Sequence, residues 1–209
     1  MKVVLFGASG MIGSRVLSEL VSRRHTVTAV ARNPEKIAAV AGVTAIKGDV
    51  LDPANIASDA QGADAVVFAY APPPTEPIAI VKAVQSLLKG LNSAGVHRVI
   101  VVGGAGSLEV APGVQLVDAP GFPEQWKDIA LAHRDVLPIL KESDIDWSYL
   151  SPSALIQPGE RTGKFRLGTT RLVANDKGES KISAEDFAVA LVDELEKPKH
   201  LRQQFTVGY

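Results

Sequence analysis

The chain contains no cysteine among its 209 residues. This absence excludes disulfide bonds, thiolate metal sites and cysteine nucleophiles, and it removes one reason to expect secretion. The four histidines are scattered and lack the spacing of a metal site, so we predict no bound metal.

An excess of charge and long apolar runs are also lacking. The 22 basic and 23 acidic residues give a net charge of −1, which argues against nucleic acids and membrane surfaces as partners. No segment reaches membrane-spanning length, and the apolar stretch after Lys2 is too short for a signal peptide. We therefore expect a cytoplasmic monomer or homodimer that acts on a small molecule.

Strand and helix patterns alternate along most of the chain. Strands are predicted at 3–6, 26–31, 43–47, 65–69, 97–102, 146–150 and 205–208, and helices at 11–23, 78–92, 124–142 and 183–196. The alternation predicts an α/β fold, a Rossmann-like doubly wound parallel sheet with helices on both faces. We expect one domain over 1–209, with a core at 1–150, a small substrate-side elaboration at roughly 151–180, and a closing helix and strand at 183–209.

Local signals refine this layout. Asn33-Pro34 and Asp52-Pro53 each resemble an N-cap followed by proline at the first helical position. Pro138 predicts a kink or break in its helix, and Ser183 begins a capping box. The stretches 110–123 and 151–178 are interpreted as irregular, the latter with short strands near 164–167 and 171–174.

The first apolar strand runs directly into Gly7-Ala8-Ser9-Gly10-Met11-Ile12-Gly13, and a helical pattern follows at once. This order places backbone N–H groups and the positive end of a helix dipole against a pyrophosphate. Gly7 fits the tight turn, Gly10 the close phosphate approach and Gly13 the packing of helix on strand. A glycine-rich turn without a ligand is the alternative interpretation.

The other strand ends complete a candidate dinucleotide site, because ligands of open α/β sheets bind at the carboxyl ends of strands. Arg32 stands where NAD-selective sites carry an acidic residue, so we predict a preference for NADP(H), with NAD(H) as the alternative. Asp49 fits either an adenine contact or a turn cap, and Tyr70 either a pocket wall or simple packing. The further candidates for cofactor contact are Ser9, Met11, Ile12, Val50, Ala69, Ala71, Gly103, Gly104, Ser151, Pro152, Ser153 and Ala154.

The chain resembles the atypical, single-domain branch of the short-chain dehydrogenase/reductase superfamily. That branch includes NmrA-like proteins, biliverdin-IXβ/flavin reductases and a bacterial NADH-flavin reductase group. The glycine motif, Arg32 and Gly48-Asp49 carry the resemblance in the first half, and the runs 146–152, 158–165, 183–188 and 205–209 carry it in the second. Within the run 158–165 and just after it, Arg161, Lys164 and Arg166 fit either a site for an anionic acceptor or a solvated loop face.

The superfamily's Tyr-x-x-x-Lys pair is missing. Counting back from Ser151-Pro152, as the resemblance to NmrA-like proteins implies, its Tyr and Lys positions hold Ile129 and His133. Biliverdin-IXβ/flavin reductases resemble this chain in carrying a histidine there, so the resemblance implies a catalytic role for His133, with a packed helix histidine as the alternative. Ser107 is the candidate hydroxyl after the fifth strand.

The resemblance implies an NAD(P)H-dependent reductase that passes hydride to a flavin, bound as substrate, or to another planar acceptor, a transfer that needs no strong general acid. The alternative is a non-catalytic NADP(H)-binding redox-sensing regulator of the NmrA type. Epimerase or dehydratase chemistry on nucleotide sugars is disfavoured, because it depends on the missing tyrosine.

Overall fold

The computed structural model describes all 209 residues and contains an eight-stranded main sheet with the strand order β10-β12-β8-β5-β4-β1-β2-β3. The first half supplies β1 (Lys2–Phe6), α1 (Met11–Ser22), β2 (Thr26–Ala31), β3 (Val43–Lys47), α2 (Pro53–Ala60), β4 (Ala65–Phe68), α3 (Ala79–Ala94) and β5 (Arg98–Val102). The second half supplies β6 (Glu109–Ala111), β7 (Val114–Gln115), α4 (Lys127–Arg134), α5 (Val136–Lys141), β8 (Asp146–Ser151), β9 (Leu155–Gln157), β10 (Arg166–Gly168), β11 (Lys181–Ser183), α6 (Ala184–Glu196) and β12 (Gln203–Gly208).

All neighbouring strands of the main sheet are parallel except β10, which pairs antiparallel with β12 at one edge. The chain builds outward from β1 to β2 and β3, and then crosses back to place β4 on the other side of β1. This reversal is the topological switch point at which doubly wound sheets bind their ligands. The predicted Rossmann-like sheet is confirmed.

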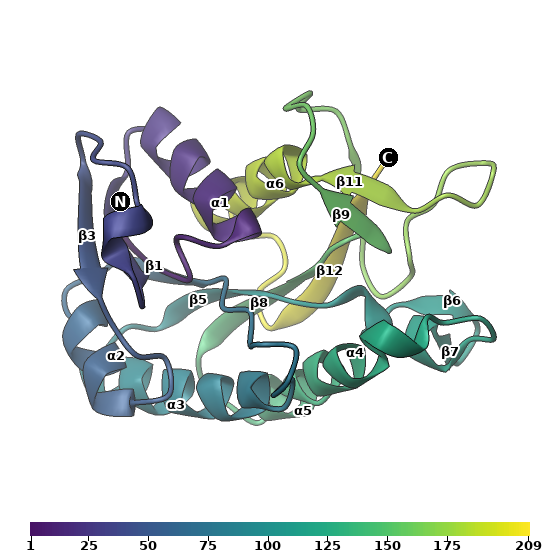
Figure 1. The fold of residues 1–209 in the computed structure, drawn as a ribbon, viewed down its shortest axis with the longest axis horizontal. Coiled ribbons are helices and arrows are strands. Elements are labelled where there is room, and N and C mark those ends of the chain that lie inside the picture. Colours follow the sequence, from purple (N-terminus) through teal and green to yellow (C-terminus); the bar gives the residue numbers. More distant parts are fainter.

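Helices cover both faces of the sheet. Helices α1 and α6 lie on one face, and α2, α3, α4 and α5 lie on the other (Figure 1). The buried apolar residues accordingly form two clusters, one of 23 and one of 22 residues, because central strands such as β4 are buried on both faces. The continuous apolar runs that predicted these strands follow from this double burial.

The helix predicted at 124–142 is broken into a 3₁₀ turn (Glu124–Trp126), α4 and α5. Helix α4 ends at Arg134, four residues before Pro138. The proline ring carries no N–H for the Arg134 carbonyl and would clash with it in a regular helix. The predicted break at Pro138 is therefore confirmed, and its position is explained.

The predicted cap at Asp52 is confirmed and the one at Asn33 is wrong. The capping box at Ser183 forms only in part, because Ser183 N donates to the Tyr209 hydroxyl and not to Asp186. The Asp52 carboxylate accepts a hydrogen bond from Ala54 N (2.9 Å), and the Ser183 hydroxyl accepts one from Asp186 N (3.0 Å), as expected of N-caps. Asn33 makes no capping hydrogen bond, and Pro34–Lys36 is a single 3₁₀ turn.

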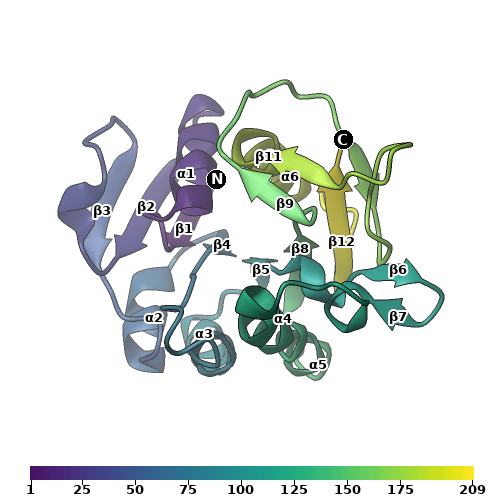
Figure 2. The same ribbon diagram turned by 45° about the vertical axis from the view of Figure 1, so that its right-hand side comes forward.

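The segments outside the Rossmann alternation were predicted least well. The strand predicted near 171–174 is wrong: only Arg171 forms an isolated bridge, to Glu109. The strand predicted at 164–167 is β10, displaced to Arg166–Gly168. Two small sheets were not predicted, β9 with β11 and the β6–β7 hairpin. The β9–β11 pair lies beside α6, and the hairpin lies beyond α4 (Figure 2).

Candidate functional site

The turn after β1 depends on two glycines. Gly7 has φ +81°, and a Cβ there would lie 2.4 Å from the Ala69 carbonyl oxygen. A Cβ on Gly13 would lie 2.1 Å from the Gly7 carbonyl oxygen, so α1 packs on the turn at a distance that only glycine permits. The fold itself therefore requires glycine at both positions, whether or not a ligand binds.

Gly10 differs from the other two glycines. Its φ of −76° suits any residue, and the nearest atom to an added Cβ is the Gly7 carbonyl oxygen at 3.3 Å. No side chain caps α1, and its first backbone bond runs from Ser14 N to Gly10 O (2.9 Å), which leaves the N–H groups of Met11 and Ile12 without partners. Unpaired N–H groups at a helix N-terminus favour an anion, and the absence of a side chain at Gly10 would let a phosphate approach.

A cavity of about 190 Å³ opens in front of this helix terminus at the carboxyl ends of β1 to β4. Most of its lining was predicted from the sequence, and the structure adds the apolar floor of β2 and the start of the loop after Gly48. The lining residues are Gly7, Ser9, Gly10, Val30, Ala31, Arg32, Gly48, Asp49, Val50, Leu51, Ala69, Tyr70 and Ala71. The structure thus brings the predicted residues from four strand ends together at the switch point.

The charged rim of this cavity is made by Arg32 and Asp49. Arg32 is exposed and makes no hydrogen bond or ion pair, so its guanidinium is free to meet an anion. Asp49 Oδ1 accepts a hydrogen bond from Leu51 N (2.9 Å), which is the turn cap that the sequence left open as an alternative. The second carboxylate oxygen of Asp49 makes no hydrogen bond, so the cap leaves it available to a ligand.

The predicted nicotinamide end lies along the sheet at β5 and β8. A Cβ on Gly103 would lie 2.2 Å from the Tyr149 ring, and one on Gly104 would lie 3.0 Å from His133 Cβ. The Tyr149 hydroxyl donates to the His133 carbonyl oxygen (2.8 Å) and accepts from Gly104 N (3.2 Å). Helix α4 is therefore fixed tightly against the end of β5, and it places His133 beside that strand end. Nothing in the sequence marks Tyr149 as a site residue beyond its place in a predicted strand.

Burial decides the charge of His133. It lowers the pKa of the imidazole to about 4, so the ring is neutral at neutral pH. Burial also raises the pKa of the Tyr149 phenol far above its usual range. Neither group carries a charge or an easily released proton, so this end of the site favours chemistry that leaves proton supply to solvent.

Ser107 and Ser151 are buried, and both accept hydrogen bonds from the Gln204 side chain. The next residues of the predicted set, Pro152 and Ser153, are also buried, and the Ser153 hydroxyl donates to the Val207 carbonyl oxygen (2.8 Å). Ala154 N donates to Ser180 Oγ (3.1 Å). These residues do not line the cavity at the glycine turn. Ser107 follows β5 and residues 151–154 lie at the end of β8, two and three strands along the sheet from β1, where an extended dinucleotide would reach.

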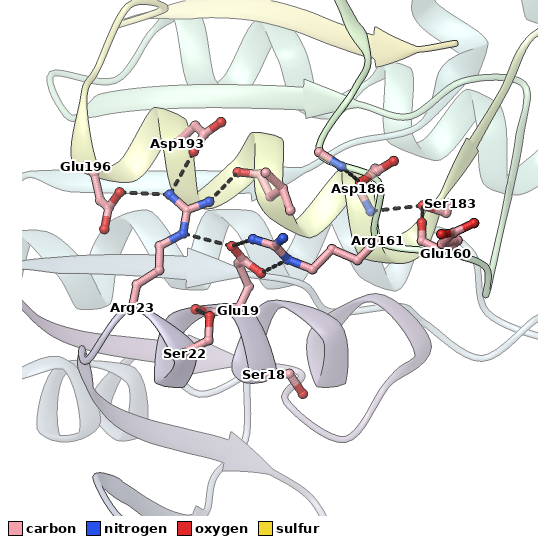
Figure 3. Close-up of polar contacts among 12 residues, drawn as sticks. Ser18, Glu19, Ser22, Arg23, Glu160, Arg161, Ser183, Asp186, Asp193 and Glu196 are labelled. Carbon is pink, nitrogen blue, oxygen red and sulfur yellow. Dashed lines mark hydrogen bonds and ion pairs between the residues drawn. The ribbon is translucent and has the colours of Figure 1, made fainter.

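The loop after β9 is pinned to the helices of one face (Figure 3). Arg161 donates through Nε and Nη2 to the two carboxylate oxygens of Glu19 on α1, both at 2.8 Å, and Glu19 is 5% exposed. Gly163 N donates to Asp186 Oδ1 on α6 (2.8 Å). Arg166 donates to two backbone carbonyl oxygens. Arg161 and Arg166 thus have protein partners, which is against their predicted use in binding an anionic acceptor.

Comparison with known proteins gives one family and several similar structures. A family model described as NAD(P)H-binding matches residues 7–198. The fold superimposes on a candidate exported protein from Burkholderia pseudomallei (50% identity, TM-score 0.90, all of both chains). It also superimposes on a candidate epimerase from Bacteroides thetaiotaomicron (42%, 0.93, 100% of this chain and 96% of that chain) and on a candidate NADH-flavin reductase from Streptococcus pneumoniae (34%, 0.88, 100% and 99%).

No helix of the structure combines the length and the apolar character that a bilayer crossing requires. Because one of the similar structures is named as exported, the cytoplasmic location stays a prediction.

Proposed function

The chain belongs to the NAD(P)H-binding family, and from that membership and the site geometry we propose that it is an oxidoreductase that passes hydride from NADPH to a flavin or another planar acceptor. The resemblance to the atypical short-chain dehydrogenase/reductases is confirmed by the family match and by similar structures that include a candidate NADH-flavin reductase. The proposal rests above all on the cavity at the switch point, where an uncapped helix N-terminus meets an unobstructed Gly10.

The chain's own residues suit this transfer. Reduced nicotinamide supplies a hydride, and the acceptor takes it with one proton, so that NADPH, oxidised flavin and a proton become NADP⁺ and reduced flavin. The glycine turn and α1 would hold the pyrophosphate, and the ends of β5 and β8 would position the reacting ring. Because His133 is neutral and Tyr-x-x-x-Lys is missing, solvent supplies the proton in this scheme.

The preference for the phosphorylated cofactor is carried by Arg32. This exposed guanidinium lies at the end of β2, where a ribose 2′-phosphate would bind, and it forms no ion pair with Asp49 on the same rim. We expect Arg32→Asp to weaken NADPH binding by at least about tenfold, or about 1.4 kcal/mol, and to leave NADH binding unchanged or tighter. Fluorescence titration with both cofactors measures this, and equal affinity of the parent protein for NADPH and NADH would overturn the preference.

A second candidate function is a non-catalytic regulator that binds NADP(H) and reports its redox state to a partner. The missing proton donor favours it, since such a protein needs none. Mixing the protein with NADPH and riboflavin, FMN or FAD separates the two functions. Loss of nicotinamide absorbance above the protein-free rate supports the reductase, whereas tight NADPH binding without turnover on flavins, quinones or dyes supports the regulator.

A further inference from the structure

One face of α4 and α5 changes from buried to exposed toward the start of α4. Ala130 and Leu137 are each 8% exposed, whereas Trp126, directly before α4, is 58% exposed. The backbone of Trp126 is already helical (φ −106°, ψ −3°). Ala130, His133 and Leu137 follow it at positions i+4, i+7 and i+11, which share one face of a helix. The indole therefore continues the face that the following turns bury against the sheet.

Trp126 is exposed because α4 begins beyond the end of the strand that it covers. A Cβ on Gly104 would lie 3.0 Å from His133 Cβ, and one on Gly106 would lie 2.8 Å from Ala130 Cβ. Toward its start, α4 thus follows the turn that leads away from β5. Trp126 lies one helical turn beyond the last of these contacts and about 10 Å along the helix axis from His133. Its indole is consequently placed above the carboxyl end of β5.

An indole left exposed on a face that is otherwise buried has no protein partner to explain it. Tryptophan is highly buried on average, and the other tryptophan of this chain, Trp147, is 1% exposed. The aromatic pairs of the structure join other rings, and none includes Trp126. A large flat apolar surface is thus free at the strand ends where the reacting rings would meet.

We propose that Trp126 is an acceptor-binding residue whose indole stacks on the planar ring of the acceptor. This inference rests on the proposed reductase function. The ends of β5 and β8 would position the reduced nicotinamide, so an acceptor that receives its hydride lies above these strand ends, where the indole is placed. Stacking on an indole needs a flat conjugated surface and no particular hydrogen-bonding pattern. The acceptor class is therefore a fused conjugated ring system, in which ring area matters more than polar substituents.

The Trp126→Ala variant tests this role through the split between KM and kcat. A stacking contact holds the ground state and the transition state alike, so its loss raises KM and changes kcat little. We expect KM for riboflavin to rise about 5- to 100-fold, with kcat and the Kd of NADPH within about twofold of the parent. Leu201→Ala is the matched control, because Leu201 is also exposed (43%) but precedes β12 at the opposite edge of the sheet.

Two further replacements separate stacking from apolar contact. Trp126→Phe keeps an aromatic ring and should recover most of the riboflavin affinity, whereas Trp126→Leu keeps apolar area without a ring and should recover little. Riboflavin titration of the NADP⁺-loaded protein measures this series without turnover. Because the side chain is exposed, the Tm of each variant should stay within about 2 °C of the parent.

The outcomes distinguish this inference from the proposed function. An active parent whose Trp126→Ala variant keeps the parent's KM and Kd for riboflavin overturns the inference alone, as does a Trp126→Leu variant that binds riboflavin as tightly as Trp126→Phe. A parent that neither binds nor reduces flavins, quinones or dyes overturns the proposed function, and the inference falls with it.

Discussion

Substitution by alanine should reduce the stability of the protein at Gly13 and its affinity for NADPH at Gly10. A Cβ on Gly13 would lie 2.1 Å from the Gly7 carbonyl oxygen and 2.8 Å from its carbon. An ordinary contact needs about 3.4 Å, so α1 must move by about 1 Å or the turn must open. We expect Gly13→Ala to lower the free energy of unfolding by about 1–3 kcal/mol, which corresponds to a fall in Tm of about 3–10 °C.

Gly10→Ala makes a smaller contact, 3.3 Å from the Gly7 carbonyl oxygen, at a φ that alanine adopts freely. Its stability should stay within about 0.5 kcal/mol of the parent. If a pyrophosphate binds at this helix terminus, however, the added methyl group would block its approach. We therefore expect the Kd for NADPH to rise at least about tenfold in the Gly10→Ala variant.

Thermal unfolding and NADPH fluorescence titration on the same two variants separate the effects. Gly13→Ala should lose stability whether or not cofactor is present, while Gly10→Ala should lose cofactor binding alone. A Gly10→Ala protein that binds NADPH as tightly as the parent would refute the placement of the phosphates. A Gly13→Ala protein as stable as the parent would refute the packing argument.

Two further predictions concern other parts of the molecule. Glu19→Ala removes the buried carboxylate that pairs with Arg161 and Arg23, and we expect the free energy of unfolding by denaturant to fall by about 2 kcal/mol. The loss should be smaller than for a fully buried ion pair, because Arg161 is half-exposed and Arg23 keeps its bonds to Asp193 and Glu196. Glu160→Ala on the same loop is the exposed control, and equal midpoints for the two variants would contradict the role of Glu19. Burial lowers the pKa of His133 to about 4, below the value of about 6.5 in the unfolded chain. Between pH 4 and pH 6.5, about the two pKa values, the imidazole is therefore protonated in the unfolded chain and neutral in the folded protein. The free energy of unfolding should thus fall on acidification across this pH range by up to about 1.4 kcal/mol per pH unit. His133→Gln should reduce this dependence on pH. Equal dependence of the unfolding free energy on pH in parent and variant would show that the pKa of His133 is not lowered by folding.

The Rossmann core could be predicted from the sequence because its signals are local. Strands buried on both faces, such as β1 and β4, are continuous apolar runs. Strand 43–47 is a partly exposed edge strand, and its bounds and those of 26–31 are marked by the charged residues, prolines and glycines that flank them. The glycine turn predicted the cavity because a strand, a turn and a helix that follow one another in sequence also adjoin in space.

The remainder depends on contacts between distant residues. Strands β9 and β11 are three residues each and pair only with one another, so neither has a period or length that distinguishes it from loop. Arg161 finds Glu19 at a separation of 142 residues, and Gln204 finds Ser107 at 97. The chemical character of these side chains is visible in the sequence, but their partners are set by the topology of the whole sheet.

Anaerobic turnover is the decisive experiment for the proposed transfer of hydride from NADPH to a planar acceptor. Nicotinamide absorbance and flavin absorbance are followed together with catalytic amounts of protein and excess NADPH and riboflavin. We expect each NADPH consumed to yield one reduced flavin, at a rate proportional to protein concentration. NADPH binding that saturates without any loss of either absorbance, on flavins and on quinones or dyes, would contradict it.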